Sequence, residues 1–448
     1  MPTRLNELTY IKNPNSTKNN GLWILCFLYI IILIIFFQEP FIKLFPDTHI
    51  RYLDELFIGA ILFSALIHSL ILRVFTHVLL ITLFAIIYMT IISYAGSPRG
   101  LSTIFEQSVI HWKFFIFAIL FVYILKVDNN GQSFRYFFLL LFAVSLVGFL
   151  INWFFQERFL EWFDTNPMYR NDTLRIQGFQ LKPNDLALHL SIIYLYVVLL
   201  AKHNYSDLVL LFGSAIFFSL IYMTGSRTAL SIIPLTLIMY VLFKKKWAVL
   251  MAVSIITSIM IIYFNETLIE MIEMTEDNIS ELSNIESTKY IRGIMIYYGI
   301  YLMIDNFPIG TGAATFGTVE SKGSPVYDDL GISGMIFFED MIGVYDSNLA
   351  SIMGEFGFIG ILLFYISLLA IYHRAMRISS YSSNKRLYLR ILLLFSILVS
   401  VVNPLFMYSY NGLLFAMAFF LVDVKNEKHQ SRTIIAGMDK LPSRGYAG

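Results

Sequence analysis

Three arginines are the residues of this sequence best suited to bind an anion. Arg175 opens the stretch Arg-Ile-Gln-Gly, Arg227 ends the run Gly-Ser-Arg between two apolar segments, and Arg292 lies inside an apolar stretch. A guanidinium group binds two phosphate oxygens through parallel hydrogen bonds and stays charged at physiological pH. If they lie on one face, the three arginines suit a doubly charged phosphate group that arrives from a lipid phase.

Each charged position also has a simpler interpretation. Arg175, at the end of an apolar segment, is typical of an anchor to lipid head groups, and Arg227, in a short turn, is typical of an arginine that reaches for the membrane surface. Asp346 or its neighbour Ser347 can cap the helix that follows. Glu355, about two turns into an apolar segment, indicates either a functional carboxylate or an ion pair with an arginine.

A glycine-rich turn lies between Arg292 and Asp346. It reads Pro-Ile-Gly-Thr-Gly, with glycines at Gly310 and Gly312. Glycines allow a bound group to approach the backbone closely, and successive N–H groups in such a turn can form a nest for an anion. This turn is therefore a candidate anion contact.

The composition predicts that these residues sit in an integral membrane protein. The chain has 448 residues, of which 57% are hydrophobic and only 14% charged, against about 25% charged in soluble domains. The 32 basic and 31 acidic residues nearly cancel, which argues against nucleic acid as a partner. Cys26 is the only cysteine, which excludes internal disulfides, zinc knuckles and iron–sulfur clusters.

Apolar runs close to the ~20 residues that cross a bilayer recur along the chain. The first run is too long for the core of a signal peptide and is interpreted as a first span. We expect about twelve spans, near residues 21–37, 55–72, 75–95, 108–125, 136–155, 185–201, 206–223, 229–243, 247–264, 349–371, 387–402 and 404–422.

Lys and Arg are retained on the cytoplasmic side of a membrane, and this sets the expected orientation. With both termini inside, the inside segments hold 20 of the 32 basic residues, and Arg175, Arg227, Arg292 and Asp346 all fall on the outer face.

The expected organisation has four parts. Residues 1–264 hold the first nine spans with an outer loop at 156–184, residues 265–346 form a large periplasmic loop before the third-last span, residues 347–424 hold the last three spans, and residues 425–448 are a cytoplasmic tail. The large loop has 14 acidic and three basic residues. Its apolar stretch 288–304 is expected to form a helix at the outer interface.

Several catalytic signatures are absent from the sequence. There is no Walker motif, no dinucleotide-binding glycine pattern, no His-Glu-x-x-His and no Asp-x-Asp. The eight histidines are scattered without metal-ligand spacing. An enzyme of this sequence is therefore expected to work without a metal, another cofactor or a soluble nucleotide donor.

The motifs, in this order, resemble the O-antigen ligase / O-antigen polymerase superfamily of bacterial envelope glycosyltransferases. They cover roughly residues 175–360, whereas the first five spans are similar only in hydropathy. The matching positions are Arg175, Gly178, Pro183 and Asn184, then Gly225, Ser226 and Arg227, then Pro308, Gly310 and Gly312, then Ser347, Asn348, Gly354, Glu355 and Gly357.

The resemblance implies an all-α, GT-C-like enzyme of the bacterial inner membrane, with its active site facing the periplasm. Its donor and acceptor would be oligosaccharides on undecaprenyl pyrophosphate, and a chain-length-regulating co-polymerase would be its partner. Arg175 and Arg292 would hold the pyrophosphate and stabilise the charge that grows as it leaves. Asp346 would be the base, with Asp340 or Glu339 behind it. Substrate contacts are expected from Arg227, Asn184, Gly310, Gly312, Asn348 and Glu355.

The loop ending favours the polymerase branch of this superfamily. In the ligase branch a histidine commonly precedes the asparagine near the end of the large loop. Here the loop ends Tyr345-Asp346-Ser347-Asn348, and no histidine occurs between His203 and His373. We expect joining of repeat units; the alternatives are a ligase that transfers the glycan to lipid A-core, a flippase for lipid-linked glycans, and a non-enzymatic assembly subunit.

Overall fold

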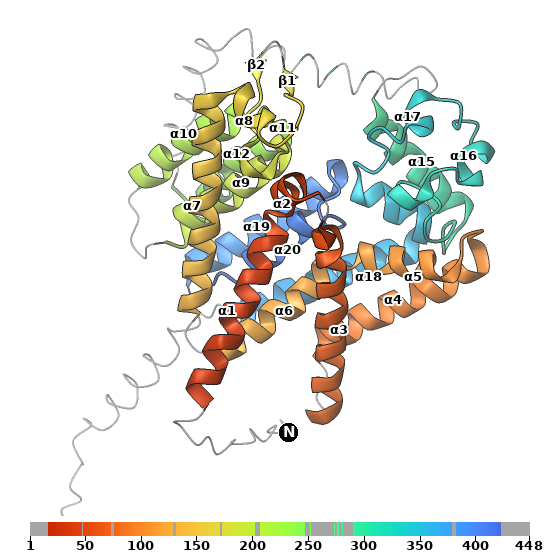
Figure 1. Cartoon of the computed structure of the whole chain (residues 1–448), viewed down its shortest axis with the longest axis horizontal. Coiled ribbons are helices and arrows are strands. Elements are labelled where there is room, and N and C mark those ends of the chain that lie inside the picture. The colour runs from red at the N-terminus through yellow and green to blue at the C-terminus, as the bar shows by residue number, and fades with distance from the viewer. Residues whose placement is uncertain are drawn as a thin grey trace, which may run out of the picture.

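The protein is almost wholly helical in the computed structural model (Figure 1). The first predicted span begins as a helix at Thr17, and the last described segment follows a short buried helix. The structure describes residues 17–46, 48–72, 76–128, 131–170, 173–201, 207–246, 290–378 and 382–422, with residues 251, 273, 276 and 280.

The helices of the first part run from the N-terminal apolar segment to the basic block at 244–246. Their bounds are α1 Thr17–Phe36, α2 Gln38–Leu44, η1 His49–Tyr52, α3 Leu53–Leu72, α4 His77–Gly96, α5 Leu101–His111, α6 Lys113–Val127, α7 Gln132–Phe155, α8 Glu157–Glu161, η2 Gly178–Gln180, α9 Pro183–Leu199, α10 Asp207–Met223, α11 Arg227–Leu230 and α12 Ile232–Lys244. Two short strands, β1 Tyr169–Arg170 and β2 Thr173–Leu174, pair antiparallel in the outer loop after α8.

The second part starts again at residue 290. Its elements are α15 Ile291–Asp305, η3 Val319–Ser321, α16 Pro325–Asp329, α17 Ile336–Glu339, α18 Asn348–Ile378, α19 Ser383–Val402 and α20 Ser409–Phe419. The predicted span 247–264, the first part of the large loop and the tail 425–448 lie outside the described residues, apart from the single positions named above.

Long apolar helices make this a multi-pass membrane protein. Within the described residues, five helices are long and apolar enough to cross a membrane, or seven if each of two bent pairs counts as one span. Large apolar side chains on their outer faces are exposed, such as Leu56 on α3 (70%) and Phe84 on α4 (58%), and such surfaces are stable against lipid rather than water. The count of twelve and the GT-C-like architecture stay predictions.

Two predicted spans are broken helices. Helices α1 and α2 meet at Phe37 with a bend of 73°, and α5 and α6 meet at Trp112 with a bend of 58°. The predicted span 108–125 therefore starts near the end of α5 and crosses the bend. The predicted span 21–37 ends where the first bend lies, so the prediction missed only that α2 follows it. The second bend was missed because His111 and Lys113 are too few polar residues to end the apolar run around them.

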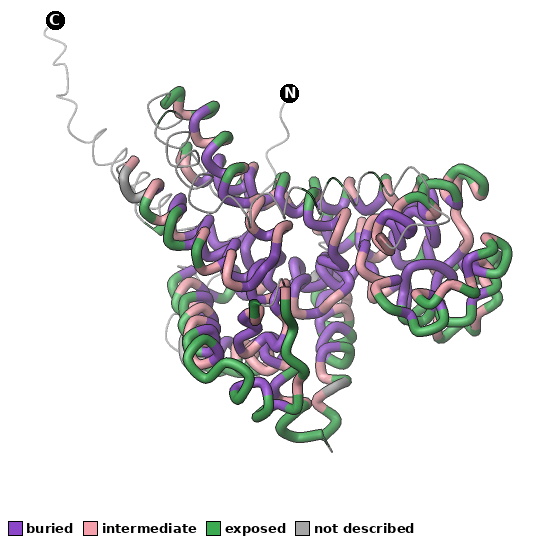
Figure 2. The backbone as a smooth tube through the Cα atoms, turned by 90° about the horizontal axis from the view of Figure 1, so that it is seen from above, coloured by how far each residue is buried: buried purple, intermediate pink, exposed green. Residues whose placement is uncertain are grey.

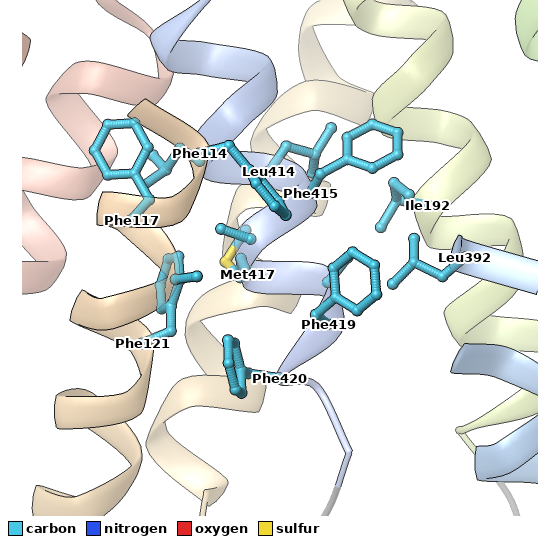
Figure 3. Packing of buried hydrophobic residues seen from close by; sticks show 14 of the residues in the cluster. Phe114, Phe117, Phe121, Ile192, Leu392, Leu414, Phe415, Met417, Phe419 and Phe420 are labelled. Carbon is cyan, nitrogen blue, oxygen red and sulfur yellow. The ribbon is translucent and has the colours of Figure 1, made fainter. Parts of the chain in front are cut away.

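The last predicted span, 404–422, also differs from a simple crossing helix. Its helix α20 has 11 residues, which is about 16 Å long and about half of a hydrocarbon core. Every residue of α20 except Tyr410 is buried. It packs on α6, and Figure 3 shows Phe114 and Phe117 of α6 beside Leu414 and Met417 of α20. A helix that is apolar on all sides belongs in the centre of a bundle.

A separate hydrophobic core lies under the outer segment. It joins α15 and the loop elements to the start of α18 through buried residues such as Met295, Phe316, Tyr327 and Phe338. Figure 2 shows this core as a buried region inside an exposed outer shell, beside the larger buried centre of the helix bundle. The predicted interfacial helix 288–304 corresponds to α15, which packs along α18. Their backbones approach closely because Gly299 has no side chain against Ala350.

Candidate functional site

Arg175 is held in place by backbone and side-chain acceptors from two other segments. Its Nε donates to the carbonyl of Thr224 (2.8 Å) and its Nη2 to Oδ1 of Asn184 (2.9 Å). Its own N–H donates to the carbonyl of Met168 (2.9 Å). The guanidinium is therefore fixed by groups that do not neutralise its charge, which leaves the charge available for a ligand.

The side chain of Arg175 packs against the Gly-Ser-Arg turn, residues 225–227. Gly225 has a φ of +66°, and a Cβ there would come within 3.0 Å of the Nε of Arg175, so a glycine suits this turn both in conformation and in space. The carbonyl of Gly225 also accepts a hydrogen bond from Nη1 of Arg170. Arg227 follows directly as the first residue of α11. One turn thus gathers three arginines.

Arg292 completes a cluster of four arginines, which we call the arginine cluster: Arg170, Arg175, Arg227 and Arg292. Burial, followed by the positive charges of Arg170 and Arg292, lowers the pKa of Arg175 to about 10. Burial and the charges of Arg227 and Arg292 likewise lower the pKa of Arg170. Like charges this close raise one another's energy, and a multiply charged anion among them relieves that repulsion. Arg170 and Arg175 come from the β1–β2 hairpin and the residue after it, Arg227 from the start of α11 and Arg292 from the start of α15.

Asp346 lies at the edge of the arginine cluster. Its Oδ2 accepts from Nη2 (3.1 Å) and Nε (3.3 Å) of Arg292, and both side chains are about one-third exposed. The following residues fix its position: Ser347 Oγ donates to the carbonyl of Val401 (2.6 Å) and Asn348 Oδ1 accepts from the N–H of Phe406 (3.3 Å). Asn348 is thus fully buried as a link to the segment before α20.

Glu355 lies in a second, buried network. Its Oε2 is 2.9 Å from Nε2 of His111, and both side chains are fully buried. Its Oε1 accepts from the backbone N–H of Thr315 (3.0 Å) and from Oγ1 of Thr318 (3.0 Å). Glu355 therefore ties the outer loop to α18 and to the break between α5 and α6.

The glycine-rich turn is locked into a kink of α18. Gly357 has non-helical backbone angles inside α18, and a Cβ on it would come within 2.6 Å of the N of Gly310; a Cβ on Gly310 would come within 2.6 Å of the N of Gly357. The N–H of Thr311 donates to Gly354 O (2.9 Å) and that of Gly312 to Glu355 O (2.8 Å). These N–H groups are engaged within the protein rather than forming a nest open to an anion.

The structure thus divides the predicted site residues into two groups. One group lies in or against the arginine cluster: Arg175, Arg227, Arg292, Asn184 and Asp346. The hydrogen bonds of Gly310, Gly312 and Glu355 stay within the loop, α18 and α5, and those of Asn348 hold the segment before α20.

Two residues of these networks were missed from the sequence. Arg170 is a lone cation five residues before Arg175. The two lie close together only because β1 pairs with β2 and brings the end of β1 near the residue that follows β2. His111 and Glu355 are 244 residues apart, which gives no local pattern. Within the described ranges, no three His, Cys, Asp or Glu side chains lie together in a way that suits a metal ion.

A polar cavity of about 140 Å³ lies beside this site. Its polar walls come from α2, the first turns of α3 and α6, the segment before α9 and the segment that leads into α20. The polar residues that line the cavity include Gln38, Glu39, Asp54, Lys113, Gln180, Lys182, Asp185, Tyr408 and Ser409.

An apolar groove of about 740 Å³ runs along helices α1, α3 and α6. Each of these helices also contributes residues to the polar cavity. It is lined by residues such as Phe27, Leu56 and Ile124. Polar walls at one end and apolar walls along the same helices are the arrangement that an amphiphilic ligand needs.

The sequence was compared with protein-family models and with curated proteins. No protein-family model matches the chain, and no curated protein matches it.

Proposed function

We propose that this protein joins lipid-linked repeat units of a bacterial surface polysaccharide, as an O-antigen polymerase, at the periplasmic face of the inner membrane. The observation that carries the proposal is the arginine cluster, in which guanidinium groups from the β1–β2 hairpin region, α11 and α15 lie next to one aspartate. Such a cluster fits a pyrophosphate, and a protein built of long apolar helices fits a pyrophosphate attached to a polyprenyl lipid. No cofactor and no nucleic acid enter the proposal.

In the proposed reaction the growing glycan moves from undecaprenyl pyrophosphate to the next lipid-linked unit with inversion. An acceptor hydroxyl oxygen forms a bond to C1 of the donor sugar while the bond from C1 to the phosphate oxygen breaks. The electron pair of that bond stays on the pyrophosphate, where Arg175, Arg170 and Arg292 stabilise the growing charge. The hydroxyl proton passes to a carboxylate, for which Asp346 is the candidate.

The ion pair between Arg292 and Asp346 links donor binding to the proposed base. In this pair Nε and Nη2 of Arg292 both donate to Oδ2 of Asp346. A pyrophosphate bound to Arg292 competes for the same guanidinium and frees this oxygen to accept a proton. The carboxylate therefore becomes available to the acceptor hydroxyl once the donor is bound.

The apolar groove along α1, α3 and α6 supports a lipid-linked substrate. An isoprenoid chain in that groove would keep its sugar at the polar end of the same helices. A co-polymerase that regulates chain length is the expected protein partner.

The first test is the surface glycan of cells that lack the protein. The deletion strain is complemented with the unchanged gene or with Arg292→Ala or Asp346→Ala. Arg158→Ala and Asp329→Ala serve as controls, because both remove an exposed charge of the same kind. We expect lipid A-core with a single repeat unit in the deletion strain and in both site variants, and full-length chains in both controls.

Other glycan profiles would identify the alternatives. Bare core with long chains on undecaprenyl pyrophosphate would make the protein a ligase, and single lipid-linked units trapped on the cytoplasmic leaflet would make it a flippase. Full-length chains in both site variants would show that the arginine cluster and Asp346 are not the site.

A further inference from the structure

The polar cavity contains charged groups that the proposed transfer step does not use. Asp54 and Lys113 lie 3.2 Å apart with their side chains about one-tenth exposed. Ser409 contacts both of them, and Gln38 donates to Asp54 (3.4 Å). Buried charges inside a membrane protein are costly and usually mark a functional path or site. The cavity therefore calls for an explanation beyond packing.

Both lysines of the cavity are paired with carboxylates and one carboxylate is left over, which distinguishes the cavity from the arginine cluster. Lys113 pairs with Asp54, and Lys182 pairs with Glu39 at 2.7 Å. Asp185, the third carboxylate, accepts at Oδ1 from Nδ2 of Asn411 (2.9 Å). With three carboxylates and two ammonium groups, the cavity repels a phosphate and favours a neutral ligand. Carboxylates accept hydrogen bonds and ammonium groups donate them, and a sugar hydroxyl does both.

One wall of the cavity has an acceptor that no protein group uses. Gln180 is 3% exposed, and its Nε2 donates to Oγ of Ser145 (2.7 Å). Its Oε1 has no hydrogen-bond partner among the described residues. Buried polar atoms are rarely left unpaired in folded proteins, and this one belongs to a side chain that lines the cavity. We therefore take Gln180 as an acceptor for a ligand that donates a hydrogen bond.

The size and the aromatic walls of the cavity fit one sugar ring. Its volume of about 140 Å³ is close to that of the ~150 Å³ cavity that holds a benzene ring in an engineered protein. Phe179, Tyr408 and Tyr410 line it, and the Nζ of Lys182 lies 5.4 Å from the ring centre of Tyr408. Aromatic faces stack on the C–H faces of sugars, while the charged walls meet the hydroxyl groups.

Two chain segments connect the cavity to the arginine cluster. Asn184 accepts the hydrogen bond from Arg175, and the next residue, Asp185, lines the cavity. On the other side, Asn348 is bonded to the N–H of Phe406, and residues 407–410 form a cavity wall. A ligand in the cavity therefore lies next to the cluster and to Asp346.

We propose that the polar cavity is a subsite for one neutral sugar residue of the acceptor, with Asp185 and Gln180 accepting its hydroxyl hydrogens. This inference rests on the proposed function, because it assigns the acceptor a place beside the pyrophosphate of the donor. It also explains why the lysines of the cavity are paired with carboxylates, whereas the cluster keeps an excess of positive charge. The first site holds a neutral ring by hydrogen bonds, whereas the second holds an anion by charge.

The test uses the full-length protein in nanodiscs with two probes. Monosaccharides released by hydrolysis of the cell's own surface polysaccharide are followed by saturation-transfer NMR, and undecaprenyl phosphate binding is followed by competition. We expect Asp185→Asn and Gln180→Met each to weaken sugar binding about tenfold, since each loses a hydrogen bond to a buried group. Both variants should bind undecaprenyl phosphate as the unchanged protein does, which also shows that they fold.

The matched control is Asp164→Asn, an exposed aspartate of the same outer loop, which should keep both activities. Arg175→Ala should show the reverse pattern, with sugar binding kept and undecaprenyl phosphate binding lost. Unchanged sugar binding in both Asp185→Asn and Gln180→Met would overturn the subsite, even if the glycan profiles support a polymerase. Sugar binding that depends on Asp185 would support the subsite even if those profiles indicate a ligase.

Discussion

The arginine cluster and the polar cavity are neighbours that handle charge in opposite ways. In the cluster, burial and the positive charges of neighbouring arginines lower the pKa values of Arg170 and Arg175, and backbone carbonyls accept hydrogen bonds from both. In the cavity, each lysine has a carboxylate within 3.2 Å. The cluster is accordingly built from loops and helix ends, whereas the cavity is built between helices.

This difference teaches that a charged residue in a membrane protein has to be judged by its partners. Carbonyl acceptors fix a guanidinium without neutralising it, so the cluster keeps a net charge for a ligand. Ion pairs remove the net charge but retain hydrogen-bonding groups. Removing one charge of the buried Asp54–Lys113 pair should therefore reduce stability, whereas removing one charge of the cluster should reduce activity.

The largest effect is expected from Lys113→Met, which removes the cation of the buried ion pair of the cavity. It tests whether ion pairs stabilise the cavity. It leaves the carboxylate of Asp54 buried without its cation, and we expect a loss of about 3–5 kcal/mol in the free energy of unfolding. Thermal unfolding in detergent measures this loss. The control is the double variant Asp54→Asn with Lys113→Met, which removes both charges and should recover much of the stability. A double variant no more stable than the single one would show that the pair is not what holds this end together.

The next effect is expected from Arg175→Ala in the cluster. Removing one fixed group that stabilises the leaving charge should slow transfer about 100- to 1,000-fold, while the unfolding temperature changes little because the repulsion from Arg170 and Arg292 is relieved. Transfer is measured with lipid-linked glycan in membranes, and Arg158→Ala is the matched control. If both variants transfer at the same rate, the cluster does not bind the leaving group.

The smallest effect is expected from Lys182→Met, at the open end of the cavity. The side chains of Lys182 and Glu39 are 44% and 47% exposed, so water compensates the loss of the pair, and the change in stability should stay below about 1 kcal/mol. Measured beside Lys113→Met, this variant shows how strongly burial alone governs the cost of a broken pair. Equal losses in the two variants would contradict that explanation.

The sequence predicted several straight apolar helices. Helices α3, α4 and α7 begin within a few residues of the predicted spans at 55–72, 75–95 and 136–155, because polar residues bound those runs. This result depends on patterns that are local in the chain. Arg175, Arg227 and Arg292 lie in one cluster, and their shared position on the outer face of the membrane stays a prediction.

What could not be predicted depends on contacts across the chain. The bend at Trp112 lies inside a long apolar run that only His111 and Lys113 interrupt, and the partner of His111 is a glutamate 244 residues further along the sequence. The motif around Gly310 was interpreted as an anion contact, since a single sequence does not show that its partner is the kink at Gly357. The polar cavity draws its walls from five separate segments, which no spacing indicates.

The mutual contact of Gly310 and Gly357 means that the two segments around them have to be exchanged together in a chimaera. Because each glycine leaves room for the backbone of the other, neither segment can be replaced alone by one with a side chain at that point. A chimaera that carries a foreign outer segment therefore needs both the turn at 308–312 and the kinked start of α18 from the same parent. Its second junction belongs after Gly357, inside the regular part of α18, rather than at the apparent end of the loop.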